Sequence, residues 1–193
     1  MSDLAKLERD LAALIGRPTD LRPFVCDGSP LDCKVFLVGL NPASPMKGDF
    51  WDFWRPGFGF DKPRWFDAYK AERAARPLKL GRTRRNAVSN SRRVVEWISS
   101  SLGAVKCLET NVYSAATEEF CDLEQQQRIT APFDLLLDRI KPAVVVVHGK
   151  DAITHIRQRR LSIETIEVNH FSRGWTEKGA RDLGHRVRTF LDR

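Results

Sequence analysis

The segment Ala143-Val-Val-Val-Val147, with Lys141-Pro142 before it and His148-Gly149 after it, decides the fold of this 193-residue chain. It is an unbroken apolar run of β-branched residues between turn formers, which predicts a strand. Lys34-Val-Phe-Leu-Val-Gly-Leu40 is a similar run and ends at Asn41-Pro42. Continuous runs of this kind are typical of strands that are buried on both faces of a parallel sheet.

Two further segments, Val105 to Tyr113 and Ile163 to Val168, are also predicted strands. Apolar residues at helical spacing predict helices over Leu4 to Ile15, Val88 to Leu102, Phe133 to Ile140, Asp151 to Arg160 and Lys178 to Leu191, with a short helix near Trp65 to Ala75. Alternating strands and helices predict a parallel sheet covered on both faces. We therefore expect a three-layer α/β sandwich with a central four-stranded parallel sheet, formed as a single domain by residues 1–193.

The composition excludes several classes of protein. The chain has no apolar run of about 18 residues, and Met1 to Arg17 is charged throughout, so we expect neither a membrane span nor a signal peptide. The expected protein is a cytoplasmic monomer. Its cysteines (Cys26, Cys33, Cys107 and Cys121) are expected to be free thiols, because their spacing is not that of a usual metal site. Whether they hold a metal cluster stays open.

Positive charge is concentrated between Arg55 and Arg93. That segment holds 12 Lys or Arg residues against three acids, in a chain of net charge +7, and aromatic residues lie before and among them. Basic side chains neutralise phosphates and aromatic faces stack on bases, so the mixture favours DNA or another nucleic acid as partner. Arg84 and Arg85 are expected to contact DNA. The alternative is a solvated basic loop over a small aromatic core.

Polar groups follow each predicted strand, where parallel sheets bind their ligands. These strand ends are Gly39-Leu-Asn-Pro-Ala-Ser44, Thr110-Asn-Val-Tyr-Ser114, His148-Gly149 and Asn169-His-Phe-Ser172. All four carry groups that can contact a small planar ligand. The sequence has no Gly-x-Ser-x-Gly elbow, no phosphate loop and no Gly-x-Gly-x-x-Gly motif, so unrelated hydrolases and nucleotide-binding proteins lack support.

These segments resemble the motifs of the uracil-DNA glycosylase superfamily, in order and spacing, over roughly Val35 to Leu191. Gly39-Leu-Asn-Pro-Ala43 looks like the first motif of its mismatch-specific uracil/thymine branch, and Thr110-Asn-Val-Tyr113 like the strand whose Asn reads the base. Lys141 to Gly149 is similar to the third strand, and His170-Phe-Ser172 to the second catalytic motif. The resemblance implies a fold of the uracil-DNA glycosylase type.

The sequence departs from the family pattern at two turns. Phe171 stands where proline is usual, and Ala43 stands where glycine is common, so the geometry of these turns is expected to differ. One branch of the superfamily carries a four-cysteine iron–sulfur cluster, but Cys107 and Cys121 are placed differently here. The cluster is not carried over, and we expect no cofactor and no metal.

The resemblance implies chemistry on a base flipped from DNA. Cleaving an N-glycosidic bond needs a positioned water behind the sugar and donors aimed at a base oxygen. Asn41 would orient the water, His170 would stabilise the departing base, and Asn111 would read the base edge. The structural alternatives are a turn residue at Asn41, a satisfied loop histidine at His170 and an amide paired with the backbone at Asn111.

Further contacts are expected around that base. Phe50 or Trp51 would stack on it, although most aromatic residues of the region are expected to be core. Ser172 would bind a phosphate or brace its loop. Arg173 or Trp175 would fill the space that the flipped base leaves, the alternative being a turn with Trp175 packed on the last helix. His148 is an additional candidate to line the pocket.

The predicted function is therefore that of a monofunctional DNA glycosylase, which removes uracil or another damaged base during base excision repair. The chief alternative is a non-catalytic protein of the same fold that binds nucleic acid or a nucleotide. The sequence does not indicate which base is removed, nor whether single- or double-stranded DNA is the substrate.

Overall fold

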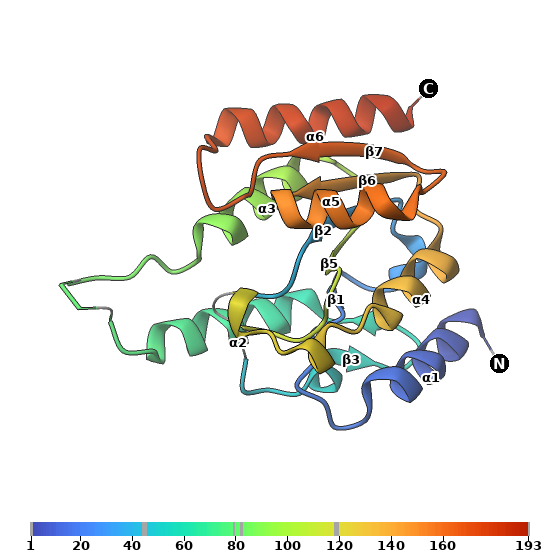
Figure 1. The fold of residues 1–193 in the computed structure, drawn as a ribbon, viewed down its shortest axis with the longest axis horizontal. Helices are drawn as coiled ribbons and strands as arrows, with labels where there is room; N and C mark the ends of the chain where they lie inside the picture. Colours follow the sequence, from blue (N-terminus) through green and yellow to red (C-terminus); the bar gives the residue numbers. More distant parts are fainter. Residues whose placement is uncertain (1, 44–45, 79, 82, 118–119, 193) are drawn as a thin grey trace.

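The computed structural model describes residues 2–43, 46–78, 80–81, 83–117 and 120–192. Its centre is a sheet with the strand order β1-β5-β2-β6-β7 (Figure 1). The strands are β1 (Phe24–Val25), β2 (Val35–Gly39), β5 (Cys107–Asn111), β6 (Val144–His148) and β7 (Glu164–Val168). β2 is parallel to both β5 and β6, and β6 is parallel to β7. The four strands predicted from the sequence are confirmed, and they form one parallel block.

The sheet is nevertheless not the purely parallel, four-stranded one that we expected. β1 adds a fifth strand antiparallel to β5, with Phe24 opposite Thr110 and Val25 opposite Glu109. The Thr110 hydroxyl donates to the carbonyl oxygen of Pro23 at 2.7 Å, which helps to hold this strand at the sheet edge. The prediction was wrong because a two-residue strand is too short to show a periodic pattern in the sequence.

In the described residues six α-helices accompany the sheet. They are α1 (Asp3–Ile15), α2 (Lys62–Ala75), α3 (Asn90–Ser101), α4 (Ala131–Ile140), α5 (Lys150–Arg159) and α6 (Glu177–Leu191). Side-chain caps fix the starts of α1, α2, α3 and α6. For example, the Ser89 hydroxyl accepts from the Arg92 N–H before α3, and the Thr176 hydroxyl accepts from the Gly179 N–H before α6. Each predicted helix is confirmed. None of these helices is long and apolar enough to cross a membrane.

Two layers of helices cover the two faces of the sheet. Val35 and Val144 belong to a buried cluster with the side chains of α3 and α6. Phe36 and Val145, one position further along the same strands, belong to a second cluster with α1, α4 and α5. Successive strand residues point to opposite faces, so unbroken apolar runs supply both clusters. Helices therefore lie on both faces of the sheet, which confirms a three-layer α/β architecture. Figure 1 shows the strands from β7 at the top to β1 below, with α6 (red) above β7 and α1 (blue) on the side of β1.

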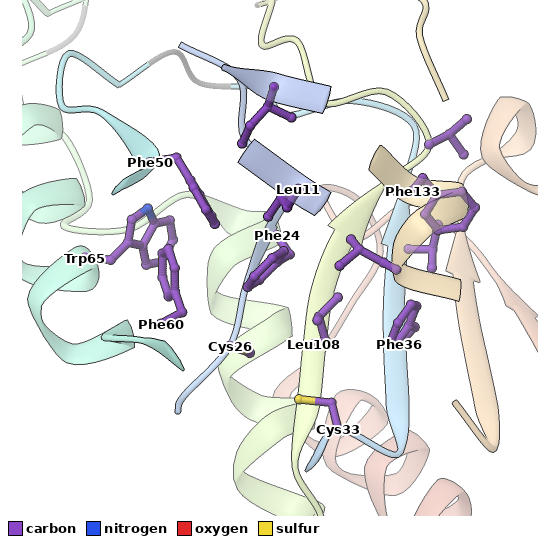
Figure 2. Close-up of a cluster of buried hydrophobic side chains, with 14 of the residues drawn as sticks. Leu11, Phe24, Cys26, Cys33, Phe36, Phe50, Phe60, Trp65, Leu108 and Phe133 are labelled. Atoms are coloured by element: carbon purple, nitrogen blue, oxygen red, sulfur yellow. The ribbon is translucent and has the colours of Figure 1, made fainter. Parts of the chain in front are cut away.

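The aromatic residues that follow β2 extend the second cluster. They lie on the 3-10 turn η2 (Phe50–Phe53) and on the hairpin strands β3 (Trp54–Arg55) and β4 (Gly59–Phe60). Figure 2 shows Phe24 between Phe50 and Phe60 on one side and Leu108 and Phe36 on the other. The ring of Phe50 stacks on Phe60, with centres 5.3 Å apart, and meets Phe24 edge-on. Much of the aromatic content of this segment is therefore core.

An ion-pair network joins α2, α3 and β5. Glu109, buried in β5, binds Lys62 at 2.9 Å and also pairs with Arg92. Glu96 binds the same two cations at 3.2 and 3.1 Å. Burial alone would raise the pKa of Glu109, but the charges of Arg92 and Lys62 hold it below its ordinary value. Two cations of the basic segment thus support the fold.

Candidate functional site

Three strand ends meet around Gly39. Gly39 ends β2 and lies opposite Asn111 at the end of β5, while His148 ends β6 on the other side. A Cβ atom at Gly39 would lie 2.6 Å from Oδ1 of Asn111 and 3.0 Å from Nε2 of His148. These two atoms therefore occupy the space that a side chain at this position would need. Glycine at position 39 lets them approach each other across the end of β2.

His170 joins this group from the turn after β7. The ring centres of His148 and His170 are 5.0 Å apart, and the rings are nearly perpendicular, at 73°. Gly149 lies beside them with a φ of 86°, and a Cβ there would be 2.9 Å from Cδ2 of His170. A second glycine at a strand end thus makes room for a site side chain.

Ser172 fixes the hydrogen-bonding role of His170. The Ser172 backbone N–H donates to Nδ1 of His170 at 3.2 Å, and the Ser172 hydroxyl lies 2.7 Å from the same nitrogen. Because Nδ1 accepts, the neutral ring carries its proton on Nε2. Burial and then the charge of Arg173 lower the pKa of His170, which favours this neutral form. His170 therefore offers an N–H donor.

Asn41 leaves the sheet beside the end of β5. Backbone pairing continues past β2, because the Tyr113 N–H donates to the carbonyl oxygen of Leu40 at 2.9 Å. The side-chain Nδ2 of Asn41 donates to Oγ1 of Thr117 at 2.9 Å, and the Thr117 N–H donates to the carbonyl oxygen of Pro42 at 3.1 Å. This arrangement leaves Oδ1 of Asn41 as the acceptor that can orient a water. Thr117 lies 76 positions along the chain from Asn41, so no local pattern indicated their pairing.

His148 occupies a more central place than the sequence suggested. Its ring stacks on Phe171, with centres 4.0 Å apart and planes at 23°. Its Nδ1 atom is buried and has no hydrogen-bond partner in the described structure. Burial, with a smaller effect from His170, lowers the pKa of His148 to about 3. This histidine is therefore uncharged at neutral pH.

Phe50 and Trp51 lie in the aromatic core. Phe50 is only 1% exposed. The Trp51 indole N–H donates to the carbonyl oxygen of Gly16 at 2.8 Å, and the Arg17 guanidinium covers its ring at 3.9 Å. Neither side chain offers an open face in this arrangement. Stacking on a base stays a prediction that would require this part of the core to open.

The two residues proposed to contact DNA from the turn after His170, Arg173 and Trp175, have different surroundings. Trp175 is partly buried: its ring meets Phe171 edge-on at 5.5 Å, and its N–H donates to the carbonyl oxygen of Asn169 at 3.3 Å. Arg173 is exposed, and its backbone N–H donates to the His170 carbonyl oxygen at 3.2 Å. Of these two, Arg173 is the one with a side chain free of the core. Ser172 is occupied with His170 and braces the loop.

Arg84 and Arg85 also have different surroundings. Arg85 donates to the carbonyl oxygens of Arg73 and Arg76 at 2.7 and 2.8 Å, and to that of Pro77. These carbonyls belong to the end of α2 and the residues after it, so Arg85 closes that helix end. Arg84 is exposed. It remains the better placed of the pair to contact a phosphate.

The residues described here do not gather three or more His, Cys, Asp or Glu side chains into an arrangement that could hold a metal ion. The four cysteines are free, and Cys26 and Cys33 are buried. No protein-family model matches the chain, and no curated protein sequence matches it either.

Proposed function

We propose that this chain is a monofunctional DNA glycosylase that hydrolyses the bond between deoxyribose and uracil, or another damaged base, flipped out of DNA. The observation that carries this proposal is the meeting of Asn111, His148 and His170 around two strand-end glycines, with His170 held as a neutral donor. One amide and two uncharged imidazoles suit a planar, uncharged heterocycle. Four motifs of the sequence resemble those of the uracil-DNA glycosylase superfamily. They support the proposal that this chain is a DNA glycosylase with a fold of the uracil-DNA glycosylase type.

The reaction assigns one task to each polar side chain. As the glycosidic bond breaks, negative charge develops on the base, and the Nε2–H of His170 donates to the base oxygen that receives it. His170 is exposed in this structure, and once the flipped base covers it and excludes water, a donor of this kind is worth about 3 kcal/mol in the transition state. Oδ1 of Asn41 accepts from the attacking water, while Thr117 holds the amide in place. Because an amide is a poor general base, we expect slow turnover.

DNA is the proposed macromolecular partner. The net charge of +7 favours binding to a polyanion, and Arg84 and Arg173 are exposed. Several other cations of the basic segment are already engaged, since Lys62 and Arg92 pair with Glu109 and Arg85 binds carbonyl oxygens. The proposed DNA contact is therefore smaller than the charge count alone would predict.

An alkali-nicking assay tests the proposal. Labelled oligonucleotides that contain uracil, hypoxanthine, xanthine or a mismatch, in single and double strands, are incubated with excess protein and then heated in alkali, which breaks the strand at abasic sites. We expect a nick at one or more of these bases. The matched control is a protein carrying both Asn41→Ala and His170→Ala, which should bind DNA and leave it intact.

The alternative function is non-catalytic binding of nucleic acid or a nucleotide by the same site. It makes the opposite prediction for the same assay, namely tight binding with no nick at any base. That result would overturn the glycosylase proposal.

A further inference from the structure

His148 is expected to destabilise the fold at the position it occupies. Its Nδ1 atom is buried and has no hydrogen-bond partner among the described residues, although an unpaired buried polar atom normally destabilises a protein. The stacked contact with Phe171 does not explain the choice, because a phenylalanine ring could stack in the same way. What distinguishes histidine here is the second ring nitrogen, Nε2, which lies beside Gly39 and Asn111.

The burial of Nδ1 indicates where the proton of His148 resides. Folded proteins leave buried N–H groups unpaired more rarely than buried acceptors. The favoured neutral form therefore has a lone pair on Nδ1 and the proton on Nε2. Stacking on Phe171 restricts rotation of the ring, so the Nε2–H stays directed toward the Gly39 side. His148 is thus a second uncharged donor in the site, beside that of His170.

Asn111 supplies the complementary acceptor. Its Oδ1 and the Nε2 of His148 lie within 2.6 and 3.0 Å of one point above Gly39. A donor next to an acceptor matches a ligand edge on which a carbonyl oxygen adjoins a ring N–H. On an amino-bearing base the same edge is reversed: an NH₂ group would meet the His148 donor, and an unprotonated ring nitrogen would meet the Asn111 oxygen.

We propose that His148 is a specificity-determining residue, which together with Asn111 selects bases carrying a carbonyl group over bases carrying an amino group at the same position. This inference rests on the proposed glycosylase function and names the substrate class of that site. A mismatched base edge leaves both the His148 donor and the Asn111 acceptor without a partner. Sites built on such pairs reject the wrong ligand by large factors, so we expect discrimination of about a thousandfold or more.

The test compares His148→Phe with the parent protein on two oligonucleotides that differ only in uracil or cytosine at one position. Phenylalanine keeps the stack on Phe171 and removes both ring nitrogens. We expect the single-turnover rate on uracil to fall at least about tenfold and the uracil-to-cytosine ratio to narrow by a similar factor. The melting temperature should not fall, because the unpaired Nδ1 disappears with the substitution. His155→Phe, at a partly buried histidine on α5, is the matched control and should leave the ratio unchanged.

A second measurement separates this inference from the proposed function. Free uracil and free cytosine are titrated into parent and His148→Phe proteins, and binding is followed by NMR, with the parent's imidazole resonances as reporters. Uracil should shift the His148 signals of the parent and bind the variant more weakly. A parental ratio of cleavage rates in His148→Phe would overturn the inference and leave the glycosylase intact. A parent protein that cleaves no base would overturn the proposed function. The binding titration would then decide the inference: weaker uracil binding by His148→Phe than by the parent would support it, and equal binding would overturn it.

If His148→Phe does not fold, His148→Gln takes its place. Glutamine offers an N–H donor and a carbonyl acceptor on a rotatable amide, so it is expected to accept either edge and to narrow the ratio without abolishing cleavage of uracil. An unchanged ratio in this variant would equally overturn the inference.

Discussion

The backbone N–H of Ser172 donates to Nδ1 of His170 at 3.2 Å, and the Ser172 hydroxyl lies 2.7 Å from that nitrogen. This relationship turns a loop histidine into a donor of fixed direction, because its other nitrogen, Nε2, must carry the proton of the neutral ring. The same contact occupies the hydroxyl that the sequence suggested for a phosphate.

His170→Ala should lower the single-turnover rate on the best substrate at least about a hundredfold, since the lost hydrogen bond strengthens only as the base departs. The affinity for DNA should change little. Ser172→Ala should lower the same rate only about tenfold, because the backbone N–H of residue 172 still orients the His170 ring. His185→Ala, on an exposed part of α6, is the control. Parental cleavage by His170→Ala would remove His170 from the mechanism.

Thr117→Val should slow cleavage about tenfold without changing DNA affinity, because the Asn41 amide loses the hydrogen bond that fixes its orientation. Thr117→Ser keeps the hydroxyl and should restore most of the rate. Equal rates for the valine and serine variants would show that Asn41 does not depend on this contact. The measurement is single-turnover cleavage beside a binding titration.

Gly39→Ala should damage the site more than the fold. The new Cβ would come 2.6 Å from the Asn111 side chain and 3.0 Å from that of His148, both of which can turn aside. We expect a loss of cleavage of about a hundredfold, because two side chains leave the site together. Gly184→Ala is the converse control. Its Cβ would meet the Ile98 carbonyl oxygen at 2.7 Å, so it should destabilise the packing of α3 on α6 by about 1–3 kcal/mol. Urea unfolding and cleavage, measured on both variants, separate the two effects.

If Arg84 and Arg85 both contacted phosphates, neutralising the pair would weaken DNA binding and flatten its salt dependence by about two units. The structure divides that effect between the two residues. Arg84→Gln should reduce the slope of log affinity against log salt by about one, with unchanged stability. Arg85→Gln should mainly destabilise the end of α2, because several carbonyl oxygens lose their donor. An equal change of slope in both variants would contradict this division.

Stability should decrease between pH 6.5 and pH 3 because of His148. The unfolded chain protonates this side chain near its ordinary pKa of 6.5, whereas the folded protein does so only at about 3. Between these values the unfolded state binds the extra proton, so the free energy of unfolding falls by up to about 1.4 kcal/mol per pH unit as the pH is lowered. Above pH 6.5 the contribution is constant. Urea unfolding at pH 7, 6 and 5 should show a shallower decrease for His148→Phe, and parallel curves would contradict the burial of this histidine.

The sequence predicted the parallel strands and the helices because each is encoded locally. The valines of β6 and the apolar run of β2 bury both faces of a strand, and a helix such as α6 repeats its apolar residues with the helical period. The positions of Asn111, His148 and His170 just after or at strand ends followed from the same patterns. The formation of each strand and helix depends on residues within about ten positions along the chain, so its pattern can be read from a single sequence.

Tertiary structure alone decided which of those residues have partners and which are buried. The antiparallel pairing of β1, the contact between Asn41 and Thr117 and the closing of α2 by Arg85 join segments whose approach no periodicity records. Phe50 is a predicted base-stacking residue and Phe171 is the neighbour of His170, yet Phe50 is enclosed by other rings and Phe171 supports His148. The physical reason is that hydrophobic patterning specifies which face of a segment is buried, whereas the packing of distant segments determines what lies against that face.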